Sequence, residues 1–398
     1  MDALRIKFQK KLAATPTKFV RDLINQIDWR NRFVGIKGAR GVGKTTLLLQ
    51  YAKLRIPNVT KSALYASLDD FYFSKNRLYD FADQFVREGG KVLLLDEVHR
   101  YADWSKELKN IYDDFPDLQV IFTGSSIIHL SKSSADLSRR AVLYSMVGLS
   151  FREFLQFRVG YKHSTISLDE LTGKHTEIAT QITNEIKPLQ YFNDYLQFGY
   201  HPYFAENIDT YHQKLAETIH LLLETDFPAV YGITYPTVDK VKTLLVILSE
   251  SVPFKPNMSK LSEHLGLTRG MLIEQLHHLE DAGILHLLHQ RAKGITRLQK
   301  PEKIYLANTN LAYALDVKNP DIGSLRETFL ISQVKPIFKV EYAEAGDFWI
   351  DNRLTLEVGG RQKGYAQIKN APNAFVAADQ LEIGTDRKIP LWLFGFLY

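Results

Sequence analysis

The sequence contains no cysteine and no long apolar run, and these absences narrow the classes of protein that it can encode. Without cysteine, its 398 residues can form no disulfide, zinc–thiolate site or cysteine-ligated iron–sulfur cluster. No window approaches the roughly 20 continuous apolar residues that cross a bilayer, and the basic N-terminus lacks the apolar stretch of a signal peptide. We therefore expect a soluble, cytoplasmic protein without a membrane segment.

Strong charge is also missing, because a net charge of +5 is too small to indicate nucleic-acid binding by itself. The charge is nevertheless uneven. The first 32 residues hold eight basic side chains against three aspartates, and a second basic run comprises Arg291, Lys293, Arg297, Lys300 and Lys303. Each run is either a solvated surface or a contact for nucleic acid.

The pattern of apolar residues predicts several domains. Up to about residue 146, the short apolar runs RFVGIKG, ALYASLD, KVLLLDE and LQVIFTG alternate with stretches of helical spacing, which is typical of a parallel sheet covered by helices. The pattern is helical and rich in aromatics from residue 149 to about 235. Short β-like runs return after residue 300, among them KIYLAN, LTLEVGG and IPLWLFGFLY.

The segment GARGVGKTT, residues 38–46, fits the phosphate-loop pattern G-x-x-x-x-G-K-[ST] and lies between a predicted strand and a predicted helix. Glycines let the backbone turn its N–H groups toward phosphate oxygens, and the helix N-terminus adds positive potential. Lys44 would reach the β- and γ-phosphates, while the Thr45 hydroxyl would ligate Mg²⁺. The sequence therefore predicts binding of ATP with Mg²⁺ by Gly38, Arg40, Gly41, Val42, Gly43, Lys44, Thr45 and Thr46.

A second motif, KVLLLDEVH, is a buried strand that ends in two acids. A carboxylate at the tip of a strand beside the phosphate loop can hold the Mg²⁺ water shell, and this is the role predicted for Asp96. Glu97 points elsewhere and could orient and deprotonate the attacking water. The acidic pair thus favours hydrolysis over transfer to a bound substrate.

Two further segments supply candidate catalytic groups. In VIFTGSS, Ser125, with Ser126 behind it, could touch the γ-phosphate, although a plain turn is the alternative. In DLSRRAVLY, Arg139 or Arg140 could stabilise transition-state charge, either in its own chain or on a neighbouring subunit. The alternative for this pair is an ordinary surface position.

Residues 258–288 have the spacing of a helix, a tight turn at Gly266, a second helix and a strand, which predicts a winged helix with residues 289–303 as the wing. On the second helix, the side chains available to contact base edges are only Arg269, Glu274, Gln275, His277 and His278. This set is thin and includes an acid, so backbone contact through the basic wing is favoured over base reading. A winged helix that is structural or docks a protein is the alternative.

The motifs GARGVGKTT, LLLDEVH and VIFTGSS, followed by GLSFREFL, resemble a branch of AAA+-type ATPases common in bacteria and archaea. Later segments, YLQFGYHP, KIYLAN and LRETFL, resemble landmarks of the same family. The resemblance implies an ATPase core, a variable helical region, a winged helix and a C-terminal domain of unknown function. Many relatives carry glycine where Arg139 stands, so the resemblance assigns the arginine role to Arg140.

The last hundred residues read as a helix with Glu327 followed by strands that carry Asp347 and Glu357, and this order resembles the PD-(D/E)XK nuclease fold. That mechanism needs a metal held by Asp347 and Glu357 and a lysine two residues further on. Gly359 stands at that position, and Lys363 or Gln362 could reach back only if the strand ends at Gly359 and Gly360. We expect a nuclease-like fold that is largely degenerate; an active nuclease, and carboxylates that are merely polar edge positions, are the alternatives.

Together these patterns predict an α/β P-loop NTPase core at residues 1–148, a helical lid region at 149–235, a winged helix at 236–299 and a small mixed α/β domain at 300–398. The predicted function is an ATPase that couples ATP binding and hydrolysis to action on nucleic acid or on a partner protein. An ATP-regulated metal-dependent nuclease and a nucleotide-sensing module with little turnover are the alternatives. The sequence leaves the oligomeric state open.

Overall fold

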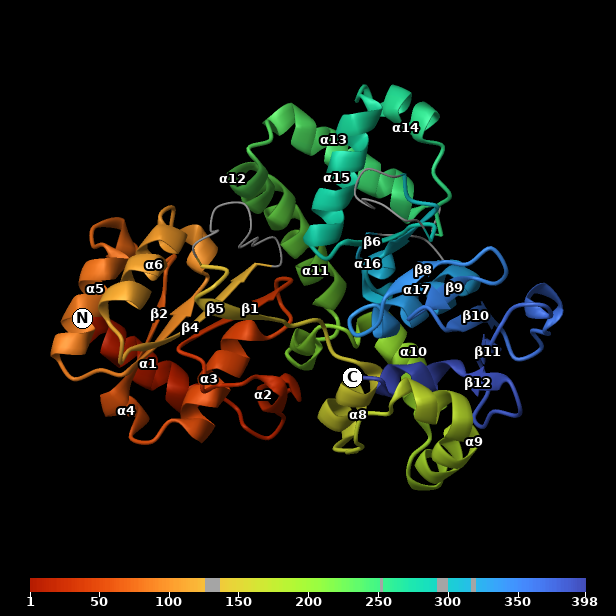
Figure 1. Cartoon of the computed structure of the whole chain (residues 1–398), viewed down its shortest axis with the longest axis horizontal. Coiled ribbons are helices and arrows are strands. Elements are labelled where there is room, and N and C mark those ends of the chain that lie inside the picture. The colour runs from red at the N-terminus through yellow and green to blue at the C-terminus, as the bar shows by residue number, and fades with distance from the viewer. Residues whose placement is uncertain (126–136, 251–252, 292–299, 316–319) are drawn as a thin grey trace. The chain divides into compact units, whose positions relative to one another are not determined.

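The computed structural model describes residues 1–125, 137–250, 253–291, 300–315 and 320–398 (Figure 1). The chain forms two compact units, Met1–Val147 and Gly148–Tyr398. None of the helices in the described ranges combines the length and the apolarity that a bilayer crossing requires.

A five-stranded parallel sheet, in the order β2-β3-β4-β1-β5, forms the centre of the first unit. The strands are β1 (Phe33–Gly38), β2 (Ala63–Ser67), β3 (Val92–Asp96), β4 (Gln119–Ser125) and β5 (Ala141–Ser145). The predicted apolar runs form the first four strands, and those strands are buried along most of their length because helices cover both faces. This confirms the predicted P-loop NTPase fold class.

The helices of this unit lie on both faces of the sheet, with α5 and α6 on one side and α1 and α3 on the other in Figure 1. Their bounds are α1 (Asp2–Ala14), α2 (Leu23–Gln26), α3 (Lys44–Arg55), α4 (Val59–Ser62), α5 (Leu78–Arg87) and α6 (Trp104–Asp114), with short 3₁₀ turns at η1 (Phe71–Ser74) and η2 (Val98–Arg100). A hydrophobic core runs through the unit and includes Phe33, Leu48, Phe81, Leu94 and Phe122.

The second unit begins with a helical region that surrounds a buried aromatic cluster. Its elements are α8 (Phe151–Val159), α9 (Leu168–Glu185), α10 (Pro188–Phe198), η3 (Pro202–Ala205), α11 (Tyr211–Leu221), the π-helical turn η4 (Leu222–Asp226) and α12 (Phe227–Tyr231). Both α8 and α9 begin with a complete capping box, at Ser150 with Glu153 and at Ser167 with Glu170.

Three helices and a β-hairpin follow: α13 (Tyr235–Ser249), α14 (Met258–Leu265), α15 (Arg269–Asp281), β6 (Leu285–Leu288) and β7 (Lys303–Leu306). Gly266 ends α14 in the left-handed conformation, at φ 58°, and so makes the tight turn before α15. Phe254 forms an antiparallel bridge to Ile304 on β7. The winged-helix assignment stays a prediction, and residues 292–299, most of the expected wing, lie outside the described residues.

The C-terminal part contains a mixed sheet in the order β12-β11-β10-β9-β8 with α17 packed against it. Its elements are α16 (Thr309–Ala314), α17 (Ile322–Val334), β8 (Val340–Tyr342), β9 (Phe348–Ile350), β10 (Leu354–Gly359), η6 (Ala366–Ile368), β11 (Ala374–Ala378), β12 (Lys388–Pro390) and η7 (Leu391–Phe396).

One expected strand is wrong. The apolar run IPLWLFGFLY is predicted to be β-like, but the strand there covers only residues 388–390, and residues 391–396 form the 3₁₀-helix η7. All six residues of η7 are buried, so the segment shows no alternation between an inner and an outer face. A fully buried apolar run carries no period that separates strand from helix.

Candidate nucleotide-binding site

The phosphate loop connects the end of β1 to the start of α3, and its backbone requires glycine at three positions. Gly41 and Gly43 adopt φ of 81° and 100°, in the left-handed region, and Gly43 is the N-cap of α3. A Cβ atom on Gly38 would lie 2.2 Å from the Met146 carbonyl oxygen. These constraints explain the glycine spacing of the motif in physical terms.

Lys44 is the first residue of α3 and is 5% exposed. Its Nζ donates hydrogen bonds to the carbonyl oxygens of Gly38, at 2.8 Å, and Ala39, at 3.0 Å, so the ammonium is bound by the loop that it follows. A buried ammonium next to a helix N-terminus is a strong attraction for phosphate.

Asp96, at the end of β3, receives hydrogen bonds from three other elements. Thr45 Oγ1 on α3 donates to Asp96 Oδ2 at 2.7 Å, and Tyr65 on β2 donates to the same oxygen at 2.8 Å. Thr123 on β4 donates to Asp96 Oδ1. Burial, together with the neighbouring Asp96 carboxylate, raises the pKa of the Tyr65 phenol. Hydrogen bonds from the neighbouring strands therefore hold the Asp96 carboxylate next to Thr45, the residue expected to ligate Mg²⁺.

Tyr65 and Thr123 are site residues that the sequence reading missed. Each is a polar side chain in a strand whose other residues are mostly apolar, and that irregularity is the signal that could have identified them.

Glu97 follows Asp96 in the left-handed conformation, at φ 52°, which is uncommon for a residue with a side chain. Its N–H donates to Thr123 Oγ1 at 3.3 Å, and its Oε2 lies 3.5 Å from His99 Nε2. Glu97 and Asp96 line, together with Thr45, a pocket of about 450 Å³. The two acids thus face one cavity beside the phosphate loop.

Ser125 ends β4, next to β1 in the sheet, and is 1% exposed. Its backbone N–H donates to His99 Nδ1 at 3.4 Å, while its Oγ has no hydrogen-bond partner among the described residues. A buried hydroxyl without a partner is costly, so a ligand atom at this edge would satisfy it. Ser126 lies outside the described residues.

The other predicted loop residues differ in how far they are buried. Val42 is fully buried in the core, Arg40 is half-buried, and the Thr46 side chain is exposed. Arg21, which the sequence reading missed, is 7% exposed and donates to the carbonyl oxygens of Val42, at 3.1 Å, and Val147, at 3.0 Å. It therefore connects the phosphate loop to the segment that follows β5.

The expectation that Arg140 acts on the nucleotide of its own chain does not fit its position. Arg140 precedes β5, whose first residue, Ala141, is in register with Phe33 at the start of β1. It therefore lies at the end of the sheet where the strands begin, whereas the phosphate loop lies at the end where the strands finish. Its guanidinium there donates two hydrogen bonds to Asp113, at 2.9 and 3.0 Å. A role for Arg140, or for the neighbouring Arg139, on another subunit stays a prediction.

The second predicted site, in the C-terminal part, contains an ammonium among its carboxylates. Lys303 Nζ on β7 lies 3.2 Å from Glu327 Oε2 on α17 and 3.0 Å from Asp347 Oδ1. Tyr305 also donates to Glu327, at 2.7 Å, and the Val358 N–H donates to Asp347 Oδ2 at 2.9 Å.

The electrostatics of this cluster favour a charged lysine. Burial alone would lower the pKa of Lys303, but the Asp347 and Glu327 carboxylates outweigh it and raise that pKa. Burial, together with the charge of Asp347, raises the pKa of Glu327. The lysine therefore supplies the positive charge that these acids need.

Glu357 on β10 pairs with a different lysine. The strand ends at Gly359, and Lys363 Nζ lies 2.5 Å from Glu357 Oε1 and from Gln367 Oε1. Gln362 is exposed. Burial raises the pKa of Glu357. Within the described ranges, no group of three His, Asp or Glu side chains could hold a metal ion. The metal role expected of Asp347 and Glu357 stays a prediction, and in this structure a lysine ammonium group pairs with each carboxylate.

Two parts of the chain match models of known protein families. Residues 30–155 match a family described as AAA domain (AAA_14), and residues 189–322 match one described as a domain of unknown function (DUF8612). The chain is 26% identical over 399 residues to the uncharacterized protein MJ1637 of Methanocaldococcus jannaschii, an alignment that covers 90% of this chain and 82% of that protein. The AAA match falls on the phosphate loop, the acidic strand and β4, in agreement with the fold of the first unit.

Solved structures show weaker likeness. The Aeropyrum pernix ORC1 protein in complex with DNA is 12% identical, with 79% of this chain and 91% of that chain covered and a TM-score of 0.31. For C. elegans PCH-2 the identity is 19% and the TM-score 0.24; the match covers 39% of this chain and less than half, 42%, of PCH-2. These scores are too low to bear on function.

Proposed function

We propose that residues 1–147 bind ATP with Mg²⁺ and hydrolyse the β–γ phosphate bond. The observation that carries this proposal is the 2.7 Å hydrogen bond from Thr45 to Asp96, because it joins the phosphate loop to the acidic strand in one site. Lys44, bound at the loop, is positioned to exchange its carbonyl partners for phosphate oxygens. Bound through Thr45 and a water shell on Asp96, Mg²⁺ would neutralise phosphate charge. The AAA-domain match at residues 30–155 supports the same activity.

Glu97 is the proposed general base. It shares the cavity of Asp96 and Thr45, and its backbone is in the left-handed conformation. Ser125 is the proposed contact for the γ-phosphate, since its buried hydroxyl lacks a partner in the part of the chain that the structure describes.

ATP turnover of Glu97→Gln tests this proposal. The variant should bind ATP like the wild type and lose at least about 100-fold in kcat, the loss typical of removing a general base. Glu88→Gln, which alters an exposed acid on the same unit, is the control. Wild-type turnover in Glu97→Gln would overturn the assignment of the base. Slow turnover in the wild type, with partner affinity that still depends on nucleotide, would favour a sensing module over an ATPase.

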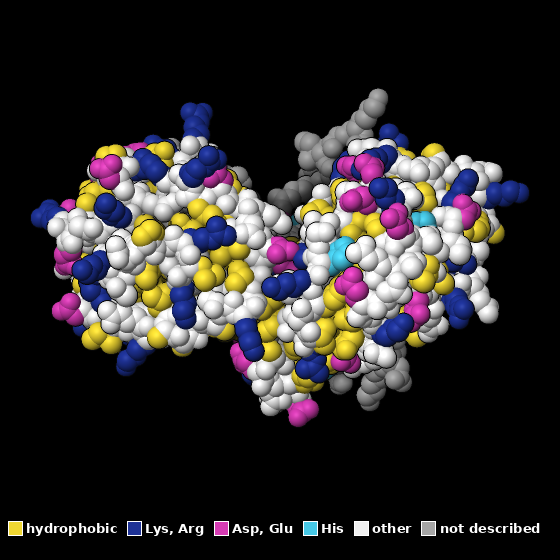
Figure 2. Space-filling model, turned by 90° about the horizontal axis from the view of Figure 1, so that it is seen from below, with side chains coloured by type: hydrophobic (Ala, Val, Ile, Leu, Met, Phe, Trp, Pro, Cys, Tyr) yellow, Lys and Arg dark blue, Asp and Glu magenta, His cyan; other side chains and the backbone are white. Residues whose placement is uncertain are grey.

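We infer that nucleic acid or a partner protein is what this ATPase acts on, and a local basic site favours nucleic acid. In Figure 2, Lys and Arg side chains are spread over the visible face among Asp and Glu side chains, so a contact must be sought locally. Lys255, Arg269 and Lys300 line a pocket of about 420 Å³ at the start of α14 and α15. Three cations around one cavity fit backbone phosphates.

The test is an ATPase assay with and without duplex DNA at two salt concentrations. Stimulation that fades with salt, and that falls in Lys255→Ala and Arg269→Ala, is the expected result. The control is Lys214→Ala, because Lys214 belongs to the same unit, pairs with Glu206 and does not line this pocket. Stimulation unchanged by both pocket variants would remove this site from the proposal.

The nuclease alternative is not favoured, because Lys303 already supplies a cation to Glu327 and Asp347. Incubation of DNA and RNA with Mg²⁺ or Mn²⁺ should leave them intact. Cleavage that Asp347→Ala abolishes would reinstate the nuclease.

A further inference from the structure

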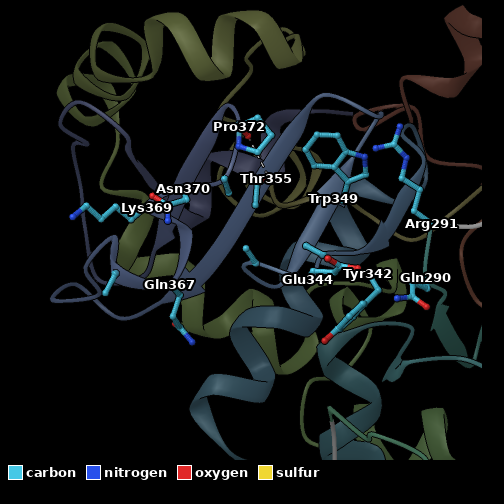
Figure 3. A pocket seen from close by; sticks show the side chains of 14 residues that line it. Gln290, Arg291, Tyr342, Glu344, Trp349, Thr355, Gln367, Lys369, Asn370 and Pro372 are labelled. Atoms are coloured by element: carbon cyan, nitrogen blue, oxygen red, sulfur yellow. Dashed lines mark hydrogen bonds between the residues drawn. The ribbon is translucent and has the colours of Figure 1, made fainter.

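A pocket of the second unit lies far along the chain from the phosphate loop. It has a volume of about 620 Å³, within the usual range for small-ligand sites. Three segments form it: the sheet residues Tyr342, Trp349 and Thr355, the segment 366–372, and Gln290 with Arg291 (Figure 3).

Hydrogen bonds fix each wall of this pocket. Thr355 Oγ1 donates to the Pro372 carbonyl oxygen at 3.2 Å, the dashed line in Figure 3, and so ties the segment 366–372 to the sheet. On the other side, Gln290 forms a parallel bridge to Tyr342, whose N–H donates to the His289 carbonyl oxygen at 2.8 Å. The pocket is therefore held open by the fold.

The lining combines an aromatic ring with cations at two ends. Trp349 is half-buried on β9, directly opposite Thr355 on β10, and the Arg291 guanidinium lies 5.9 Å from the centre of its ring. Figure 3 shows Trp349 and Arg291 together at one end, and Lys369 and Asn370 at the other. Arg291 and Lys369 are both exposed and can meet an anionic group.

Side-chain amides supply the remaining polar groups. Gln290, Gln367 and Asn370 line the pocket, and each offers both hydrogen-bond donors and an acceptor. Glu344, exposed at the rim, is the one acid among the described lining residues. An aromatic face, amides and cations together match the π-face, the polar edge and the phosphate of a nucleotide.

We propose that this pocket binds one nucleotide of a single-stranded nucleic acid, with its base stacked on Trp349 and a flanking phosphate at Arg291 or Lys369. Stacking on an aromatic side chain together with a positively charged groove is how proteins hold single strands without reading sequence. An uncharged peptide could contact Trp349, but it has no anionic group to pair with Arg291 and Lys369. This inference does not rest on ATP hydrolysis.

The neighbouring cluster indicates binding without cleavage. Thr355 and Glu357 are two residues apart on β10 and so lie on the same face of the sheet. Gln367 lines the pocket and bonds to Lys363, the partner of Glu357. The pocket thus adjoins carboxylates that already have lysine partners, and a strand held there meets no metal site among the described residues.

Fluorescence anisotropy of a fluorescein-labelled dT12 strand, with the full-length protein and no ATP, tests the proposal. Trp349→Ala should weaken binding about tenfold or more, and Trp349→Phe, which keeps a stacking ring, only about threefold. Arg291→Ala should weaken binding and reduce the salt dependence by about one counterion. The control is Arg353→Ala, since Arg353 pairs with Asp169 and does not line the pocket.

Competitors separate the proposal from its rivals. Unlabelled dT12 should displace the labelled strand, whereas a blunt duplex and AMP at equal base concentration should not. Equal competition by AMP would assign the pocket to free nucleotides, and equal competition by duplex would exclude base stacking; either result overturns the proposal. Binding that is absent in the wild type, or unchanged in a Trp349→Ala protein whose circular dichroism and Tm match the wild type, also overturns it.

Discussion

The Nζ atom of Lys303 lies 3.0 Å from Oδ1 of Asp347, and this contact joins strand β7 of the β6–β7 hairpin to the C-terminal sheet. The side chain of Lys303 is 8% exposed and that of Asp347 is 15% exposed, so the pair is largely shielded from solvent. Glu327 lies on the other side of the same ammonium. The contact therefore connects the hairpin to the sheet and places a cation between the two acids.

Replacing Lys303 by methionine should destabilise the second unit strongly. Removing one partner of a buried ion pair leaves an uncompensated charge and costs about 3–5 kcal/mol. The pKa of Glu327 is already raised in the folded state, so the free energy of unfolding of the variant should rise as the pH falls from 7 toward the ordinary value of 4.5. Denaturant unfolding at several pH values measures both effects.

Lys214→Met is the matched control for this experiment, because the side chains of Lys214 and its partner Glu206 are 43% and 67% exposed. Such a pair contributes about 0–1 kcal/mol. A Lys303→Met protein as stable as this control at pH 7 would show that the buried pair does not contribute to the free energy of unfolding.

Ser125→Ala should separate catalysis from stability. The Ser125 hydroxyl is buried without a partner among the described residues, so its removal should leave the Tm unchanged or slightly higher. If the hydroxyl contacts the γ-phosphate, kcat should fall at least about tenfold with little change in KM. Steady-state kinetics and a thermal melt on the same preparation measure both, and an unchanged kcat would exclude the contact.

Acid should destabilise the second unit through His201. Burial lowers the pKa of His201 to about 3, and the residue is 3% exposed. Because the folded-state pKa lies below the ordinary value of 6.5, the stabilising contribution is complete above pH 6.5 and is lost as the pH falls toward 3. The loss should reach about 2 kcal/mol at pH 5.

The variants His201→Gln and His264→Gln check this pH dependence in denaturant unfolding. His201→Gln should unfold with a flatter pH dependence below 6.5, while replacement of the exposed His264 should keep the wild-type slope. Identical slopes in the two variants would mean that His201 is not the titrating group.

Asn310→Ala should cost more stability than any exposed asparagine. Asn310 is fully buried; it accepts hydrogen bonds from the Tyr200 N–H, at 2.8 Å, and the Tyr211 hydroxyl, at 2.6 Å, and donates to the carbonyl oxygens of Tyr195 and Leu196. Truncation leaves these groups unsatisfied, at about 1–3 kcal/mol each. We expect a loss of at least about 3 kcal/mol.

Asn207→Ala, on an exposed turn, should change the free energy of unfolding by no more than about 0.5 kcal/mol. Equal stability of the Asn310 and Asn207 variants would contradict the role of Asn310 as a hydrogen-bonding centre.

The phosphate loop could be predicted because its signals are local. The glycines, the lysine and the flanking strand and helix are adjacent in the chain, and the backbone angles at Gly41 and Gly43 show why those glycines are needed. Asp96 was equally accessible, since it ends an apolar strand. Its partners Tyr65 and Thr123 were not, because only the strand order brings β2 and β4 to either side of β3.

Contacts set by tertiary packing could not be read from the sequence. Lys303 belongs to a basic run and looked like part of a solvent-facing wing, yet it contacts Asp347, 44 positions away. Arg140 lies in the candidate segment DLSRRAVLY, but the register of β5 with β1 places it at the end of the sheet opposite the phosphate loop. Residues 391–396 are apolar throughout, so their 3₁₀ conformation had no periodic signal.

The most direct test of the central claim is the thermal stability of wild type and Lys44→Ala with and without Mg·ATP. If the first unit binds ATP phosphates through Lys44, ATP at 100 times its Kd should stabilise the wild type by about 2.7 kcal/mol and raise the Tm, and the variant should show little shift. Equal shifts in the two proteins, or none in the wild type, would contradict nucleotide binding at the phosphate loop.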